Sequence, residues 1–236
     1  MSQLTRLQSE LYSLGSPAKA KILSRFFKTG PGEYGEGDVF AGVTVPVSRR
    51  LAVKYKNVSW PEIASLISSK IHEARLIALL ILVHNFKAGG IAEREKIFSF
   101  YLRNTRHINN WDLVDLSAHE IVGGYLLNRP RAILMKLARS SSLWERRIAM
   151  MATFQFIKHG QAGDTLKIAK MLLHDKHDLI HKVAGWMLRE AGKRVSLDTE
   201  RKFLDTYAQD MPRTMLRYAI ERMPEPERRK YMALGK

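Results

Sequence analysis

A short helical pattern recurs through the middle and the end of the chain, and it constrains the fold more than any other feature. Small or apolar residues follow a basic turn in RLIALL, RRIAMM and KVAGWML, and LRYAIE is similar; these segments begin at Arg75, Arg146, Lys182 and Leu216. The spacings are 36, 35, 36 and 34 residues when five positions are aligned: Ala78, Val114, Ala149, Gly185 and Ala219. Such lengths are typical of two-helix solenoid units, each of which buries its apolar face against the next unit.

The segments between chain breakers favour helices throughout. Residues 73–86 (EARLIALLILVHNF) are long and apolar and lack the two-residue alternation of strands. Breakers such as Ser16-Pro17 and Gly89-Gly90 separate the helices. We therefore expect an all-α fold, a superhelical solenoid of HEAT-like (ARM-repeat-like) repeats, forming a single domain over residues 1–236 with a concave face. An ordinary helical bundle is the alternative.

The charge of the chain points to a polyanionic partner. Lys and Arg total 39 against 23 Asp and Glu, which gives a net charge of +16. No apolar run approaches the ~20 residues of a spanning helix, so nucleic acid is preferred over a membrane. We therefore expect the concave face of the single domain to be basic and to bind DNA. The absence of Cys excludes disulfides, thiolate nucleophiles and cysteine-ligated zinc, and it fits a reducing cytoplasm. The first residues, MSQLTRLQSELYSLG, lack a signal-peptide pattern and read as a first helix. We expect a cytoplasmic monomer, associated with the nucleoid in a bacterium.

One segment, NNWDLVDL, carries a tryptophan and a carboxylate at helical spacing. Asn109 or Asn110 suits the N-cap of a helix, and Asp112 in its first turn is explained by the helix dipole. Asp115 lies one turn after Trp111 and shares its helix face, so the indole is placed to shield the carboxylate. Asp115 is therefore the better candidate for chemistry.

Two residues of the following repeats align with this helix. Arg147 stands two residues before Ala149, and Trp186 stands one after Gly185. Together with Trp111 and Asp115 they would offer two indoles, a guanidinium and a carboxylate to a deoxyribose phosphate. The structural alternative is that these tryptophans pack between repeats.

The segments NNWDLVDL, LWERRIAM and HKVAGWMLREAGK resemble, in order and spacing, stretches of the AlkD family of alkylpurine DNA glycosylases. The resemblance extends as a helical pattern from about Ser16 to Met223. It implies a HEAT-like solenoid that excises cationic N3- or N7-alkylated purines from duplex DNA without a metal or cofactor. It also implies that Asp115 is the catalytic carboxylate, that Trp111 and Trp186 contact the sugar of the lesion, and that Arg147 binds phosphate.

The chain departs in two places from a member of that family with which we compare it. Phe26 stands where that protein has a tyrosine on its second helix, so a hydroxyl contact is lost. The acidic, glycine-rich loop from Gly30 to Asp38 is longer. Although this loop fits G-x-G-x-x-G, it follows a helix and its acids would repel a pyrophosphate, so we do not expect a nucleotide there.

Further basic residues are candidate phosphate contacts, and a solvated helix face is the alternative for each. They are Arg49 and Arg50 after Pro46, and Lys182 and Arg189 on the helix that carries Trp186. Lys182 is also the residue that a Schiff-base lyase would use, although we expect a monofunctional enzyme. His174, His177 and His181 lack a zincin motif and are expected at solvated helix ends, not around a metal.

Two other functions remain open from the sequence. A catalytically silent HEAT-repeat module would bind DNA or scaffold a protein partner through the same face. An RNA-binding repeat protein would need recognition residues in every repeat. The candidate residues here cluster in only three repeats, which argues against the RNA reader.

Overall fold

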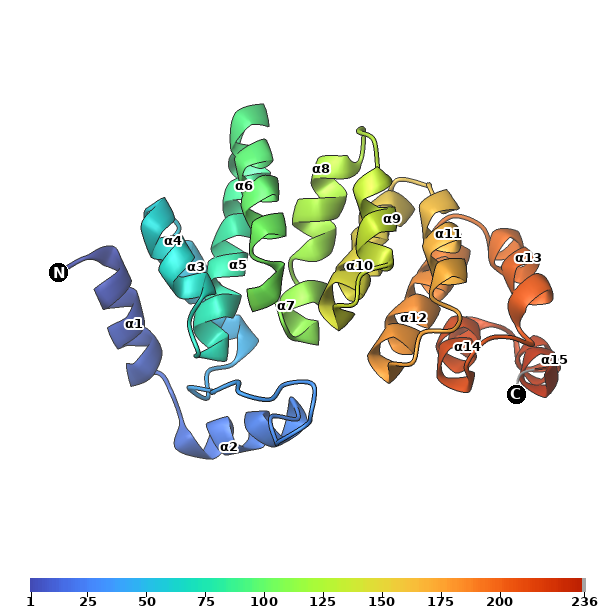
Figure 1. Cartoon of the computed structure of the whole chain (residues 1–236), viewed down its shortest axis with the longest axis horizontal. Coiled ribbons are helices and arrows are strands. Elements are labelled where there is room, and N and C mark those ends of the chain that lie inside the picture. Colours follow the sequence, from blue (N-terminus) through green and yellow to red (C-terminus); the bar gives the residue numbers. More distant parts are fainter. Residues whose placement is uncertain (235–236) are drawn as a thin grey trace. The chain divides into compact units, whose positions relative to one another are not determined.

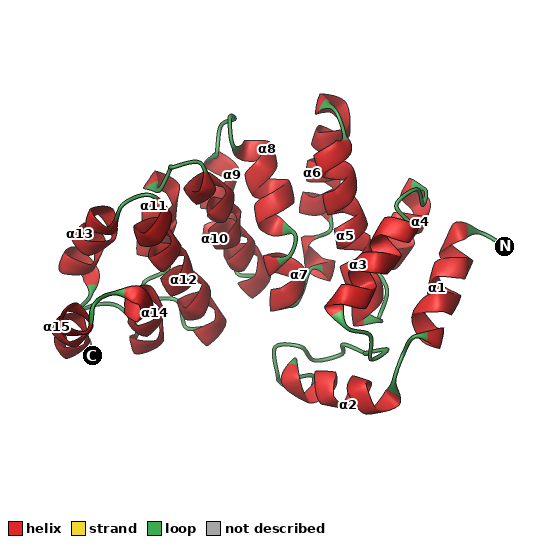
Figure 2. Cartoon of the chain, turned by 180° about the vertical axis from the view of Figure 1, so that it is seen from behind, coloured by secondary structure: helices red, strands yellow, loops and turns green. Residues whose placement is uncertain are grey.

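This computed structural model describes residues 1–234, which fold into helices joined by turns and loops (Figure 1). No strand occurs within these residues, as the helix and loop colours of Figure 2 show, and β pairing is limited to an isolated bridge between Val39 and Ile71. The predicted all-helical repeat fold is confirmed. In the same residues, no helix has the length and apolar character needed to cross a membrane.

The chain forms two compact units, and the first comprises Met1–Ser117. Its helices are α1 (Gln3–Ser13), α2 (Pro17–Phe26), α3 (Val45–Lys54), α4 (Trp60–Ile67), α5 (His72–Ala88), α6 (Ile91–Arg103) and α7 (Trp111–Asp115), with a 3₁₀ turn at Thr105–His107. Helix α2 runs crosswise to α1 and α3 in Figure 1. The predicted first helix is confirmed as α1.

The second unit begins at Ala118. It contains a π-helical turn (His119–Gly123), α8 (Gly124–Leu126), α9 (Ala132–Ala138), α10 (Leu143–Lys158), α11 (Gly163–Met171), α12 (Asp178–Arg194), α13 (Leu197–Tyr207), α14 (Arg213–Ala219), a 3₁₀ turn (Ile220–Arg222) and α15 (Glu225–Leu234). The expectation that both units act as one domain stays a prediction.

Serine side chains start several of these helices. The hydroxyl oxygens of Ser2, Ser16, Ser142 and Ser196 each accept a hydrogen bond from a backbone N–H in the first turn of the following helix. Such caps satisfy donors that have no partner within the helix, and each contributes about 1 kcal/mol. Polar residues between the apolar segments therefore set where the repeats begin.

The aligned small or apolar positions mark the packed side of one helix in each repeat. Ala78, Val114 and Ala149 are completely buried, in α5, α7 and α10 respectively. Gly185 in α12 is also buried, and Ala219 in α14 is 1% exposed. The spacing found in the sequence therefore corresponds to one buried position per repeat.

The basic residue three positions before the marker is a structural link in two repeats. Arg75 Nη1 donates to the carbonyl of Ser69 at 2.8 Å, and Arg146 Nη1 donates to that of Ser140 at 3.0 Å. Each guanidinium also binds a carboxylate, because Arg75 reaches Asp38 at 2.6 Å and Arg146 reaches Asp175 at 2.6 Å. In these two repeats, the basic residue therefore links the first turn of its helix to the segment before it.

We expect Gly185→Ala to destabilise the protein, because α12 and α14 approach closely at this glycine. A Cβ atom would lie 2.3 Å from the carbonyl oxygen of Met215, which is backbone and cannot turn aside. Overpacking of this kind costs about 1–3 kcal/mol, measurable by chemical denaturation. Gly163→Ala is the matched control, since its Cβ meets no atom within 4 Å. Equal stability of the two variants would show that α12 and α14 can separate without cost.

Candidate functional site

The short helix α7 carries Trp111 and Asp115 at its two ends. Its N-cap is Asn110, whose side-chain oxygen accepts the Trp111 N–H at 2.8 Å, so the second of the two predicted caps is the correct one. The Asn110 side chain is fully buried, and its amide donates to Asp38 Oδ2 at 3.2 Å. Trp111 and Asp115 are both partly exposed, as a residue that meets a substrate must be.

Aromatic rings fix one face of the Trp111 indole. Phe27 stacks on it with a centroid distance of 5.0 Å and an interplanar angle of 16°. Phe26 meets it edge-on at 5.8 Å and is itself 61% exposed. Phe26, which we expect to stand in place of a family tyrosine, therefore extends an exposed apolar surface beside the candidate tryptophan.

A buried charge network lies beneath α7. The His72 ring lies between two carboxylates, with Nδ1 2.9 Å from Asp38 Oδ2 and Nε2 2.9 Å from Asp112 Oδ2. Arg75 Nη2 donates to the second oxygen of Asp38 at 2.6 Å. All four residues are less than a tenth exposed. Asp112 is thus a buried structural anchor, beyond the helix-dipole role that the sequence indicates.

The hydrogen bonds of this network govern its protonation. Burial, the largest influence, would lower the pKa of His72, but the bonds to Asp112 and Asp38 outweigh it and the pKa is raised. For Asp38, burial would raise the pKa, but the bond to His72 and the charge of Arg75 leave it lowered. The network therefore favours charged Asp38 and protonated His72.

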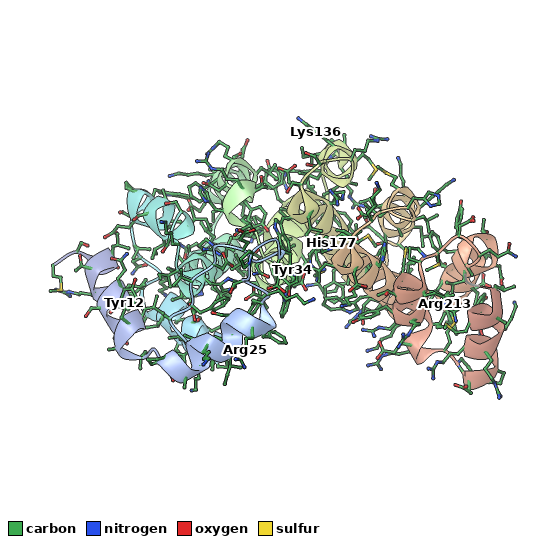
Figure 3. All side chains as sticks on the ribbon, turned by 60° about the horizontal axis from the view of Figure 1, so that its bottom comes forward. Tyr12, Arg25, Tyr34, Lys136, His177 and Arg213 are labelled. Carbon is green, nitrogen blue, oxygen red and sulfur yellow. The ribbon has the colours of Figure 1, made fainter. Side chains whose placement is uncertain are left out.

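The segment before α3 is held to α5 by the carboxylate of Glu73. Glu73 is 2% exposed and accepts the backbone N–H groups of Ala41, Gly42 and Val43 at 2.9, 2.9 and 3.1 Å. Figure 3 shows Tyr34 in the loop between α2 and α3, the loop predicted to be acidic and glycine-rich. Its glutamates, Glu33 and Glu36, accept N–H groups of the loop itself. This loop is therefore built by its own acidic side chains.

Asp115 lies in a different environment from Asp112. It is only partly buried, and its charge acts on Tyr101, a fully buried residue whose hydroxyl lies 3.0 Å from Ser117 Oγ. Burial raises the pKa of Tyr101, and the charge of Asp115 raises it further. Of the two acids on α7, Asp115 is the one with access to solvent.

The second unit holds Arg147 and Trp186. Arg147 on α10 is 5% exposed, and its Nη1 donates to the carbonyl of Leu179 at 2.6 Å. Trp186 on α12 is partly exposed, and its ring lies 6.3 Å from that of Phe154, which in turn stacks on His119 at 5.6 Å. The predicted convergence of these residues with Trp111 and Asp115 stays a prediction.

The basic candidates fall into two groups. Arg49 and Arg50 on α3 are exposed and form no ion pair within residues 1–234. Lys182 instead pairs with Asp178 at 2.6 Å, and Arg189 forms an ion pair with Glu221. The structure thus leaves the α3 arginines available to an anion, whereas Lys182 and Arg189 already have protein carboxylates beside them.

His177 and His181 form hydrogen bonds at the N-terminus of α12. Figure 3 shows His177 at the beginning of α12, where its Nδ1 accepts the Leu179 N–H at 3.1 Å. His181 Nε2 lies 2.5 Å from the carbonyl oxygen of Asp175. Within the described part of the chain, no three potential metal-ligating side chains come together.

Sequence reasoning missed the buried network, although part of its signal was visible. Three charged or titratable residues, His72, Glu73 and Arg75, open the most apolar segment of the chain. Polar groups that enter a core must find partners there. This pattern could have indicated buried anchors, but Asp38 and Asp112 were too distant in sequence to be identified as the partners.

Comparisons with known proteins identify the family of the chain and its fold. A sequence model of the DNA alkylation repair enzyme family matches residues 7–223. A solved chain described as a predicted DNA alkylation repair enzyme from Enterococcus faecalis superposes with a TM-score of 0.69 and 16% sequence identity, over 89% of this chain and 97% of that chain. This likeness shows a shared fold. The comparison with curated proteins found no match. The family match spans most of the chain, so this protein belongs to the DNA alkylation repair enzymes, and its substrate is DNA.

Proposed function

We propose that the protein is a monofunctional DNA glycosylase that hydrolyses the N-glycosidic bond of cationic N3- or N7-alkylated purines in duplex DNA. The observation that carries the proposal is the partly exposed Asp115 carboxylate on the helix that presents Trp111. The resemblance of this segment to the alkylpurine glycosylases supports it, as does the family of the chain.

The chemistry asks little of the protein, because the alkylated purine is a good leaving group. As the bond from C1′ to the purine nitrogen breaks, its electron pair moves to the purine and neutralises the positive charge. The sugar becomes oxocarbenium-like, and water adds at C1′ and loses a proton to Asp115 or to solvent. A carboxylate stabilises the cation and orients the water, as carboxylates do in glycoside hydrolysis.

Each remaining candidate has a supporting role in this proposal. The Trp111 and Trp186 indoles lie against the deoxyribose, and Arg147 binds a phosphate. Arg49, Arg50, Lys182 and Arg189 contact the DNA backbone. Lys182 is paired with Asp178 at 2.6 Å, so its amine is engaged by a carboxylate, which supports hydrolysis over a Schiff-base step. The protein acts as a cytoplasmic monomer without a cofactor.

The direct test is release of free base from duplex DNA that contains N7-methylguanine, with DNA binding measured in parallel. Wild-type protein is expected to release the base and leave an abasic site without strand cleavage. Binding with no release, also from N3-methyladenine, would favour the catalytically silent binding module. Strand cleavage at the abasic site would contradict the monofunctional assignment.

The two exposed arginines of α3 give a second prediction. A protein that neutralises phosphates loses about 0.9 log units of affinity per contact for each tenfold rise in salt. Arg49→Gln combined with Arg50→Gln should therefore reduce the salt slope of DNA binding by about 1.8. Lys202→Gln with Lys230→Gln removes the same charge from exposed ion pairs and should leave the slope unchanged. Equal slopes for both double variants would remove α3 from the DNA interface.

A further inference from the structure

His72 faces an acceptor at each nitrogen of its ring. Asp38 and Asp112 each lie 2.9 Å from one ring nitrogen, and the His72 side chain is 2% exposed. A neutral imidazole carries one N–H and can donate to only one carboxylate, whereas an imidazolium donates to both. With both carboxylates ionised, the geometry therefore requires the protonated ring.

The charges around His72 balance only in that state. Asp38 and Asp112 supply two negative charges, and Arg75, bound to Asp38, supplies one positive charge. The neighbouring Glu73 carboxylate is directed to the backbone N–H groups of residues 41–43. With a neutral His72 the buried group would hold one uncompensated negative charge, which is costly in an interior.

The same ring belongs to the aromatic stack that supports Trp111. Phe40 stacks on His72 at 4.5 Å, and Phe27 lies 5.0 Å from it. Phe27 in turn stacks on Trp111 at 5.0 Å. His72 therefore contacts α7 directly, through its hydrogen bond to Asp112. It also contacts Trp111 indirectly, through the ring of Phe27.

We propose that His72, held as an imidazolium, is a positioning residue that fixes Trp111 and the helix that carries Asp115. This inference rests on the proposed glycosylase function only where it concerns activity. The pKa of His72 is raised above its ordinary value, because the bonds to Asp112 and Asp38 outweigh burial, and this favours the imidazolium. As pH rises through that pKa, the bond to one carboxylate is lost, α7 loosens, and base excision should decline.

Nuclear magnetic resonance tests the coupling without any catalysis. Imidazole ¹⁵N shifts of His72 should show both nitrogens protonated at pH 7. In protein labelled with 5-fluorotryptophan, the Trp111 signal, assigned with Trp111→Phe, should shift with the same midpoint as His72. A neutral His72 at pH 7, or a Trp111 signal that does not follow it, would overturn the proposal.

Kinetics supply the second arm, with His84→Gln as the matched control because His84 is a partly exposed residue of the same helix. His72→Gln should lower kcat about 10- to 100-fold, since small misplacements of catalytic groups have effects of this size. The DNA dissociation constant should stay within about twofold of wild type, and the alkaline decline in kcat should disappear. A lower melting temperature with unchanged kcat would reduce His72 to a purely structural residue.

A second variant and the resonance experiment separate failure of this proposal from misfolding and from failure of the glycosylase function. If His72→Gln does not fold, Asp112→Asn removes one acceptor charge and keeps the ring, and it should cause the same fall in kcat. If wild-type protein releases no base, the proposed function fails, and the resonance experiment alone decides whether His72 positions Trp111.

Discussion

Asp115→Asn is expected to slow release of N7-methylguanine by at least about 10²- to 10³-fold, the loss typical when one charge-stabilising group is removed. Asparagine keeps the shape of the side chain but cannot offer a negative charge to the oxocarbenium-like sugar. Because the carboxylate contributes to the transition state and not to phosphate binding, the DNA dissociation constant should change by less than about twofold. Single-turnover assays with binding measured alongside test both statements.

Asp198→Asn is the control for loss of one negative charge, since Asp198 is exposed and, among residues 1–234, forms an ion pair only with Lys202. It should leave the rate unchanged. If wild-type protein releases base and Asp115→Asn releases it at a near-normal rate, the glycosylase assignment stands and Asp115 is not its catalytic carboxylate. The catalytic group would then have to come from another element.

The sequence predicts the fold well because the signal is repetitive. A small or apolar residue that returns every 34–36 positions marks the packed side of successive helices, and all five marked positions are buried. The N-cap was predicted to be Asn109 or Asn110, because asparagine suits the start of a helix, and the structure shows that it is Asn110. Local chemistry and periodicity decide these features, so one sequence is enough to identify them.

The sequence does not show which residues distant along the chain become hydrogen-bond or ion-pair partners. Asp112 lies 40 residues from His72, and only the folded chain shows that the two meet. Arg189 illustrates the reverse case, because a basic residue on a candidate helix has its charge matched by Glu221 from the next repeat. Arg147 likewise binds the carbonyl of Leu179. A pattern of charges predicts a surface, whereas pairing across repeats decides which charges remain available on it.

Asp38→Asn is expected to lower the free energy of unfolding by about 3–5 kcal/mol, the usual cost when one partner of a buried ion pair is removed. Asp38 accepts hydrogen bonds from Arg75, His72 and Asn110 and is 8% exposed. Asparagine would leave the Arg75 and His72 charges buried with only one carboxylate. Urea denaturation at pH 6 measures the loss, and Asp210→Asn, at an exposed position, should cost less than about 0.5 kcal/mol.

The pH dependence of stability separates this network from ordinary packing. The pKa of Asp38 is lowered in the folded protein, so its contribution is present above the unfolded value of about 4 and is lost as pH falls through the folded pKa. The pKa of His72 is raised, so its contribution is complete below about 6.5 and is lost as pH rises through the folded pKa. The network therefore stabilises the first unit most between about pH 4 and 6.5, and Asp38→Asn should flatten the curve on both sides of that window. A variant that lost the same free energy at every pH would instead indicate a packing defect, with the charges of Asp38 and His72 contributing nothing.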